Sequence, residues 1–381
     1  MSIIENLLKT KEKKVFFQMG GQGSPWYREL KKIYDTQEYK EFFFHCFDSL
    51  NELKSLTSNA IATPKGIHPE LWLKDESTLP EEDYLSTAGI SLIMIQVTQL
   101  AYFEQLRTRY PLEKILEIVA GATGHSQGLI SITLVALGLD GNDYYEALRF
   151  YMKYITYLAL RSQEVFPYLE PSEEDLKLAH ELKLSDPSPM VAVLGSDHST
   201  IKHLVDAFNQ KYPDEPRIYV SLYNSPTNRI LSSHRKSLLL FYKENQTFFA
   251  EHKIRYIFLK TTCPFHSPYM EEAYIKSLED VRKLNFSYDT KDFKIPIYTF
   301  ATGEDYRNHS DLLKIMGKDL LINTLHWDKA ILPAVNHQVG YIIDFGPGKT
   351  SQRLTTENLE HFQSNIPVLT MSNPKEVKEI L

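Results

Sequence analysis

The sequence predicts an α/β fold made of more than one unit, and three observations lead to it. Short apolar segments at residues 14–17 and 116–120 each run into a glycine-rich turn that a helical pattern follows. Residues 190–259 are patterned as strand, helix, two strands, helix and strand. Residues 295–348 return to alternating strands and helices, which is typical of a sheet covered by helices.

The composition is that of an ordinary globular protein and argues against several kinds of partner. Of 381 residues, 43% are hydrophobic, which is enough for a core, and the net charge of −7 argues against nucleic acid. Two cysteines, Cys46 and Cys263, cannot form a disulfide framework, so a reducing compartment is expected. Neither a signal peptide pattern nor an apolar run of about 18–20 residues is present. We therefore expect a cytoplasmic protein that does not bind membranes.

The N-terminal part is expected to begin with a buried strand at residues 14–17. A glycine-rich loop at residues 20–24 follows, and a helix is expected at residues 26–34. Residues 46–84 are polar, contain prolines and are expected to be irregular. Apolar residues at three- and four-residue spacing then predict a long helix over residues 84–106.

The central part repeats this order. Residues 116–120 are expected to form a second buried strand, which ends in a glycine-rich turn at residues 121–128. Helices are expected at residues 129–137 and 143–163. Residues 164–188 are acidic and rich in proline, so a surface connection is expected there.

Residues 188–262 are expected to form a small subdomain inserted into a larger α/β body made of residues 1–187 and 263–381. Its order of elements is βαββαβ, the signature of a ferredoxin-like unit. The expected elements are strands at residues 190–194, 217–222, 229–232 and 255–259, and helices at residues 199–211 and 235–249. In the body, strands are expected at residues 295–300 and 340–344, and a helix at residues 311–321.

Ser126 is the candidate nucleophile. It lies in the sequence Gly-His-Ser-Gln-Gly, which fits the G-x-S-x-G pattern of a serine on a sharp strand-to-helix turn. The N-terminus of the following helix would supply free N–H groups where an oxyanion forms. By composition this pattern arises by chance in roughly one chain in ten, so a plain glycine-rich turn is the alternative. The strand expected before it and the helix expected after it favour a nucleophile.

His266 is the candidate base, since a serine hydroxyl needs a base to become a nucleophile. It lies between Pro264 and Pro268, which restrict the backbone on both sides and suit a side chain that must hold one pose. A structural histidine in a turn is the alternative. His125 is expected to point away from the site, because neighbouring side chains on a tight turn diverge.

The loop Gly-Gly-Gln-Gly-Ser at residues 20–24 lacks the spacing of a P-loop and of a dinucleotide fingerprint. Two interpretations stay open. The loop is either a tight turn or a segment whose backbone approaches the nucleophile and supplies a hydrogen-bond donor.

Five motifs, taken together and in order, resemble those of the malonyl/acetyl-CoA:acyl carrier protein transacylase family over nearly the whole chain. They are GQGS at residues 21–24, GHSQG at 124–128, NSPTN at 224–228, PFHS at 264–267 and DFGPGK at 344–349. The chain most closely resembles the starter acetyltransferase domain of fungal-type fatty acid synthases. That likeness lies in LWL at residues 71–73, PEEDYL at 80–85, QLAY at 99–102 and LRSQ at 160–163.

The resemblance implies an α/β-hydrolase-like large subdomain with the ferredoxin-like unit inserted. It implies a ping-pong reaction in which Ser126 is acylated and His266 is the base, oriented by a main-chain carbonyl. The N–H groups of Gln22 and Gln127 would hold the oxyanion. Acyl-CoA and the phosphopantetheine of an acyl carrier protein would be the substrates. No permanently bound cofactor or metal is expected, and we expect a monomer.

Malonyl-selective members of this family carry an arginine in the helix after the nucleophile, which grips the malonyl carboxylate. Two alignments of the helix put Tyr154 or Leu158 at that position, so we expect an uncharged acyl group, acetyl or longer. Tyr154, Leu158, Arg161 and Asn224 are the expected lining of the acyl pocket. A rotated helix would bring Arg161 or Lys153 into the site, and a malonyl transferase with a displaced arginine is the alternative.

Other functions remain open at this stage. A hydrolase that releases acyl groups from carrier proteins would use the same serine and histidine. A lipase-like esterase would need an acidic partner for the histidine, and a catalytically inactive carrier-binding module would need neither residue. Because carrier proteins are acidic, a basic rim is expected, with Arg229, Arg235 and Lys236 as candidates.

Overall fold

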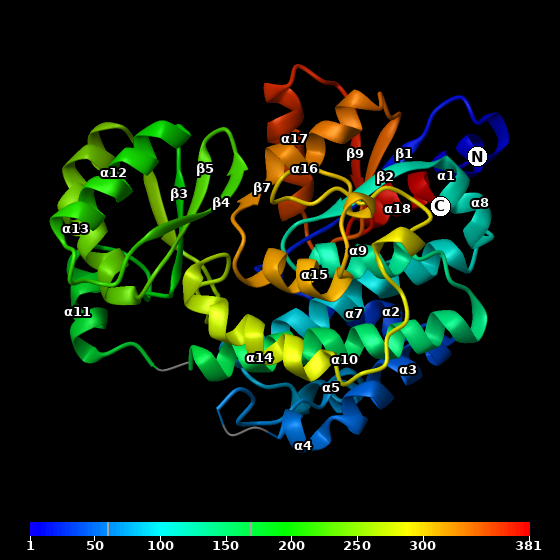
Figure 1. The fold of residues 1–381 in the computed structure, drawn as a ribbon, viewed down its shortest axis with the longest axis horizontal. Helices are drawn as coiled ribbons and strands as arrows, with labels where there is room; N and C mark the ends of the chain where they lie inside the picture. The colour runs from blue at the N-terminus through cyan, green and yellow to red at the C-terminus, as the bar shows by residue number, and fades with distance from the viewer. Residues whose placement is uncertain (59–60, 168–169) are drawn as a thin grey trace.

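The computed structural model describes residues 1–58, 61–167 and 170–381, whose strands form two sheets (Figure 1). One sheet contains β1 (Val15–Met19), β2 (Val119–Gly124), β8 (Tyr341–Asp344) and β9 (Val368–Thr370), in the order β2-β1-β8-β9. The other contains β3 (Met190–Leu194), β4 (Tyr219–Ser225), β5 (Asn228–Ser232), β6 (Arg255–Phe258) and β7 (Leu325–His326), in the order β6-β3-β5-β4-β7. The protein is a mixed α/β protein, as its sequence predicts.

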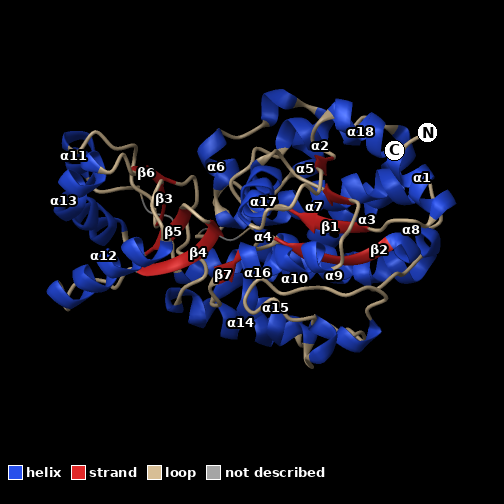
Figure 2. Cartoon of the chain, turned by 90° about the horizontal axis from the view of Figure 1, so that it is seen from above, coloured by secondary structure: helices blue, strands red, loops and turns tan. Residues whose placement is uncertain are grey.

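The four-stranded sheet is parallel throughout and is surrounded by helices (Figure 2). All five residues of β1 are buried, which is typical of a central strand of a parallel sheet. Helices from the first half of the chain are α1 (Ile3–Thr10), α2 (Tyr27–Tyr34), α3 (Lys40–Glu52), α4 (Lys54–Thr57), α5 (Pro69–Lys74), α6 (Glu82–Ser86), α7 (Ala88–Arg107), α8 (Leu112–Ile118), α9 (Gly128–Ala136) and α10 (Gly141–Val165).

The later helices are α11 (Glu173–Glu181), α12 (His198–Lys211), α13 (Arg235–Glu251), α14 (Glu271–Val281), α15 (Leu312–Leu321), α16 (Trp327–Asn336), α17 (Thr350–His361) and α18 (Pro374–Ile380). Short 3₁₀ turns lie at Gln37–Tyr39, Glu76–Thr78, Pro268–Met270, Thr290–Asp292 and Tyr306–Asn308. α10 packs against α7, α14 and α3. Within the described ranges, no helix is both long enough and apolar enough to span a bilayer.

The five-stranded sheet uses its two faces differently. Val191 and Val193 of β3 pack in a hydrophobic cluster with residues of α12 and α13, whereas Met190 and Ala192 belong to the main core. This follows from the two-residue period of a strand. α11, α12 and α13 lie on the side of the sheet away from the rest of the molecule (Figure 1). The opposite face is therefore free to form one wall of the site.

β7 was not expected from the sequence. It comes from the C-terminal part of the chain and pairs in parallel with β4, through Leu222 with Leu325 and Tyr223 with His326. A two-residue strand has too short a pattern to be read from one sequence. β7 ties the C-terminal part to the five-stranded sheet through backbone hydrogen bonds.

Three sequence-based expectations about secondary structure are wrong. Residues 116–118 end α8, whose buried Leu112, Ile115 and Ile118 have helical spacing, and β2 begins only at Val119. Residues 295–300 form only isolated bridges, Ala122 with Ile297 and Tyr298 with Asp305. Residues 46–84, expected to be irregular, contain helices. The expected surface connection at residues 164–188 contains α11, in which Ala179 is the one buried residue. A short apolar run fits helix and strand equally, which explains the first error.

The turn between β2 and α9 is packed tightly against the end of β1. A Cβ atom on Gly124 would lie 2.0 Å from the backbone carbon of Gly128. A Cβ atom on Gly128 would lie 2.4 Å from the carbonyl oxygen of Met19 and 2.5 Å from that of Gly20. Only glycine fits at these two positions, and the turn can therefore approach the glycine-rich loop closely.

Replacement of Gly128 by alanine is expected to destabilise the fold, because backbone atoms surround the new methyl group. We expect a loss of about 1–3 kcal/mol in the free energy of unfolding, measured by urea denaturation. Gly340→Ala is the matched control, because its Cβ would meet only the flexible side chain of Lys13. An equal loss of stability in both variants would contradict the close packing of the turn.

Candidate active site

Ser126 lies on the turn between β2 and α9 in a strained backbone conformation, with a φ of 52°. A positive φ is uncommon in residues other than glycine, and at this turn it lifts the side chain away from the sheet edge. The hydroxyl oxygen Oγ lies 2.8 Å from Nε2 of His266, although 140 residues separate the two in sequence. The sequence expectation that these side chains meet is thus met by their geometry.

A main-chain carbonyl orients the His266 ring. Nδ1 lies 2.8 Å from the carbonyl oxygen of Asn323, so Nδ1 carries the proton and donates it there. The lone pair of Nε2 is then free to accept a proton from Ser126. Burial lowers the pKa of His266 to about 4, so the imidazole is neutral near pH 7.

Asn323 is itself held by Asp319, which is not among the site residues that the sequence predicts. The Asn323 side chain donates to Asp319 Oδ1 at 2.7 Å, while Thr299 and Tyr306 donate to Oδ2. Asp319 is 2% exposed, and burial raises its pKa while these hydrogen bonds oppose the rise. No sequence motif marks this cluster, since its members come from different loops and helices.

The backbone N–H groups of Gln22 and Gln127 donate no hydrogen bond to any part of the chain that the structure describes. Both side chains are held elsewhere. Gln127 Nε2 donates to the carbonyl oxygen of Leu92 at 3.1 Å, and Gln22 Nε2 donates to Ser91 Oγ. Two unpaired donors thus flank the serine, one at the start of α9 and one on the glycine-rich loop.

A cavity of about 370 Å³ opens at Ser126 and His266. One wall is the glycine-rich loop, and the opposite wall is the inner face of the five-stranded sheet. The sheet contributes apolar side chains to this wall, among them Met190, Ala192, Leu222 and Ile230. The cavity is therefore a cleft with a polar end at Ser126 and an apolar wall opposite.

The expectation that His125 points away from the site is wrong. His125 lines the same cavity, and its Nε2 lies 2.8 Å from Oδ1 of Asn224. The ring also packs edge-on against Trp327, which holds it beneath the glycine-rich loop. Asn224 lines the cavity as well, as expected for a pocket residue.

Three of the four expected pocket residues do not line this cavity. Tyr154 is buried under α15 and donates its hydroxyl to the carbonyl oxygen of Leu313 at 2.8 Å, and Leu158 is buried in the core. Arg161 lies outside the cleft, paired with Asp280 at 2.7 Å and Glu164 at 2.6 Å. The reason is geometric, because α10 packs against α7 and α14 and turns these side chains away from Ser126.

Arg229 is not the exposed rim residue that the sequence suggested. It is 5% exposed, and its guanidinium donates to the carbonyl oxygens of Ser225, Pro226 and Asn228. It therefore braces the loop that carries Asn224. Lys236 is exposed and pairs with Glu215.

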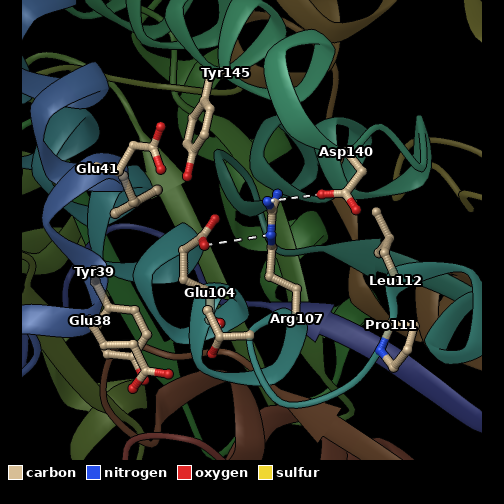
Figure 3. A pocket seen from close by; sticks show the side chains of 11 residues that line it. Glu38, Tyr39, Glu41, Glu104, Arg107, Pro111, Leu112, Asp140 and Tyr145 are labelled. Atoms are coloured by element: carbon tan, nitrogen blue, oxygen red, sulfur yellow. Dashed lines mark hydrogen bonds and ion pairs between the residues drawn. The ribbon is translucent and has the colours of Figure 1, made fainter.

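A further cavity of about 300 Å³ lies between α3, α7 and the start of α10, away from Ser126 (Figure 3). Its centre is Arg107, which pairs with Glu104 at 3.5 Å and Asp140 at 3.2 Å and lies over the ring of Tyr144. These contacts balance a partly buried cation and join α7 to α10. We assign this cluster a structural role.

The chain is similar in sequence and in fold to known proteins. The sequence matches the family described as "Starter unit:ACP transacylase in aflatoxin biosynthesis" over residues 17–270. It is similar to fatty acid synthase subunit beta of Schizosaccharomyces pombe, with 31% identity over an alignment of 360 residues that covers 87% of this chain and 16% of that protein. The chain thus spans about a sixth of the length of this curated relative.

Two solved structures share the fold. A malonyl CoA-acyl carrier protein transacylase from Clostridium perfringens has 17% identity and a TM-score of 0.66, covering 96% of this chain and 95% of that chain. A malonyl-transacylase in complex with a type II PKS acyl-carrier protein has 15% identity and a TM-score of 0.68, covering 97% and 99%. Because the family match extends over more than half of the sequence, this chain belongs to the starter unit:ACP transacylases and is an acyltransferase.

Proposed function

We propose that this chain transfers an uncharged acyl group from coenzyme A to the phosphopantetheine thiol of an acyl carrier protein, through an acyl ester on Ser126. The observation that carries the proposal is the 2.8 Å contact between Ser126 Oγ and Nε2 of His266, beside two unpaired N–H groups. Family membership supports the carrier protein as the acceptor.

The first half-reaction begins when Nε2 of His266 takes the hydroxyl proton as Ser126 Oγ attacks the thioester carbonyl. The N–H groups of Gln22 and Gln127 are the proposed donors to the resulting oxyanion. One such donor is worth about 3–4 kcal/mol in the transition state. Protonated His266 then gives its proton to the departing coenzyme A sulfur, which leaves neutral His266 and acyl-Ser126.

The second half-reaction runs the same steps with the phosphopantetheine thiol as the nucleophile. His266 takes the thiol proton, the sulfur attacks the ester, and the proton returns to Ser126 Oγ. The Asn323 carbonyl keeps Nδ1–H in place through both halves, so Nε2 serves as base and acid in turn. This scheme requires no Asp or Glu carboxylate in contact with the imidazole as a third member beside Ser126 and His266.

The preference for an uncharged acyl group is supported by the ion pairs of α10. Its three basic residues all pair with carboxylates outside the cleft: Arg149 with Asp48 and Glu52, Lys153 with Glu52, and Arg161 with Asp280 and Glu164. Lys260 and Arg353 line the cleft but are more than half exposed and are themselves paired. A malonyl carboxylate near Ser126 would therefore lack a buried partner and would be costly to desolvate.

We also propose that residues 188–262 form the small subdomain and that residues 1–187 with 263–381 form the large one. The carrier protein would approach the cleft between them, and the chain would act as a monomer. The neutral side chains at the end of the cleft near Ser126 suit an uncharged acyl group. The exposed cations at the rim of the cleft suit an acidic carrier protein.

Replacement of Ser126 should abolish acylation of the enzyme, and replacement of His266 should slow it. With acetyl-CoA, Ser126→Ala is expected to gain no acyl mass. His266→Ala should acylate about 10²–10⁴-fold more slowly than the parent, by intact mass spectrometry over time. Carrier protein should then remove the acyl group from the parent enzyme and become acylated itself. Rapid loss to free acid without carrier protein would instead support the hydrolase, and an acylated Ser126→Ala variant would refute the assignment.

The acylation rate should change little between pH 8 and pH 5. His266 must be neutral to act as a base, so the rate falls only as pH drops through its folded-state pKa, about 4. If the base were an ordinary histidine with a pKa near 6.5, the acylation rate would fall roughly 30-fold from pH 8 to pH 5. Single-turnover acylation at each pH measures this, with circular dichroism as the control for folding. An inflection near pH 6.5 would contradict a desolvated base.

Malonyl-CoA should acylate Ser126 at least about ten-fold more slowly than acetyl-CoA, because its carboxylate finds no buried partner. Competition between the two thioesters in one reaction, read by intact mass, measures the ratio directly. Arg161→Gln should leave the ratio unchanged, because Arg161 is paired outside the cleft. A preference for malonyl that Arg161→Gln removes would establish the alternative with a displaced arginine.

A further inference from the structure

A second cavity adjoins the active-site cleft, and the proposed reaction with acetyl groups does not use it. We call it the annex. Its volume is about 320 Å³, and its walls include Trp26, Leu85 and Ile95. Four residues line both the annex and the cleft: Gln22, Gly23, Ser24 and Lys260. The partition between the two spaces is therefore the glycine-rich loop and one lysine side chain.

The side chain of Gln22 spans this partition. Its Nε2 donates to Ser91 Oγ in the annex wall, and its Oε1 accepts from Thr261 Oγ1 in the cleft wall at 3.2 Å. Nε2 also donates to the carbonyl oxygen of Ser86 at 3.5 Å. None of these three partners is charged, so the side chain can leave without stranding a charge. The backbone N–H of Gln22, which we assign to the oxyanion, makes none of these contacts.

The loop is held firmly at one end and loosely at the other. At Gly21, an added Cβ would lie 2.5 Å from Nδ1 of His125, so the backbone beside Ser126 is fixed. At Gly23, with a φ of 107°, no atom of the described residues, apart from the two chain neighbours, lies within 4 Å of an added Cβ. Lys260 pairs with Glu82, but both side chains are exposed, and such a pair restrains little. The partition can therefore open at its tip while the oxyanion donor stays in place.

The annex wall suits an alkyl chain. Ser91 and Ile95 are four residues apart on α7 and so share one face, which places the partner of Gln22 beside an apolar surface. Leu85 of α6 and Trp26 extend this surface, and both are buried. A hydrocarbon entering here would bury apolar area, whereas a charged group would find only the exposed Lys260 and Glu82.

We propose that the annex receives the distal part of an acyl chain longer than acetyl, which displaces the side chain of Gln22 as it enters. The substrate class is then a medium-chain fatty acyl thioester. This inference rests on the proposed function, because the chain that enters is the one esterified to Ser126. Specificity for chain length would lie with Gln22, Ser91 and Ile95.

The test compares octanoyl-CoA with acetyl-CoA as sources of acyl-Ser126, by intact mass. The parent enzyme should be labelled by both. Ile95→Phe fills the annex and should lower the octanoyl-to-acetyl labelling ratio at least ten-fold. Leu71→Phe is the matched control, because it adds the same ring on α5, at a half-exposed position outside both cavities, and should leave the ratio unchanged. Ser91→Ala removes a partner of Gln22 and should raise the ratio several-fold.

The outcomes separate the two proposals. Labelling by acetyl-CoA but not octanoyl-CoA in the parent would overturn the annex assignment and leave the proposed function standing. Octanoyl labelling that neither Ile95→Phe nor Ser91→Ala alters would place the chain elsewhere and also overturn it. If Ile95→Phe does not fold, the result with Ser91→Ala decides alone. Labelling by neither thioester would overturn the proposed function, and this inference with it.

Discussion

The close contact between two stretches of backbone is the constraint on which this active site depends. The turn that carries Ser126 folds so tightly on itself that glycine is required at Gly124, and it approaches the end of β1 so closely that glycine is required at Gly128. Packing at this distance brings the glycine-rich loop to the side of Ser126. The N–H groups of Gln22 and Gln127 lie on these two segments and donate no hydrogen bond to any described residue. The position of the two proposed oxyanion donors thus follows from the close approach of the segments that come after β1 and β2.

The position of His266 beside Ser126 depends on a hydrogen bond and not on close backbone packing. His266 has a φ of 56° and lies on a loop after β6, and its ring is fixed by the carbonyl oxygen of Asn323. That carbonyl depends on Asp319, whose buried carboxylate accepts hydrogen bonds from three side chains. A carbonyl orients the imidazole without placing a charge against it. Burial can therefore keep the ring neutral, which is the state that a base requires.

Much of this arrangement could be predicted because local pattern and chemistry agree. Gly-His-Ser-Gln-Gly between a strand and a helix predicts the position of Ser126, and the prolines around His266 favour a fixed side chain. The sequence could not show that α10 turns Tyr154, Leu158 and Arg161 away from the cleft. That rotation is set by packing against α7 and α14, which no periodicity of α10 alone encodes. For the same reason the sequence alone places Arg229 on the surface, whereas its burial depends on carbonyl groups that only the folded loop brings together.

The use of charge along α10 bears on how this enzyme would select its substrate. A single arginine facing Ser126 would read a carboxylate by charge, and this recognition would be strong because the cleft is desolvated. Here the basic side chains of α10 instead join it to α3 and α14 through ion pairs, and the cleft is left with apolar walls. Apolar walls discriminate weakly, by about 1–3 kcal/mol for each methylene that fits or fails to fit. Selection among uncharged acyl groups would therefore depend on the volume open to the acyl chain, and the loop proposed to supply an oxyanion donor also bounds that volume.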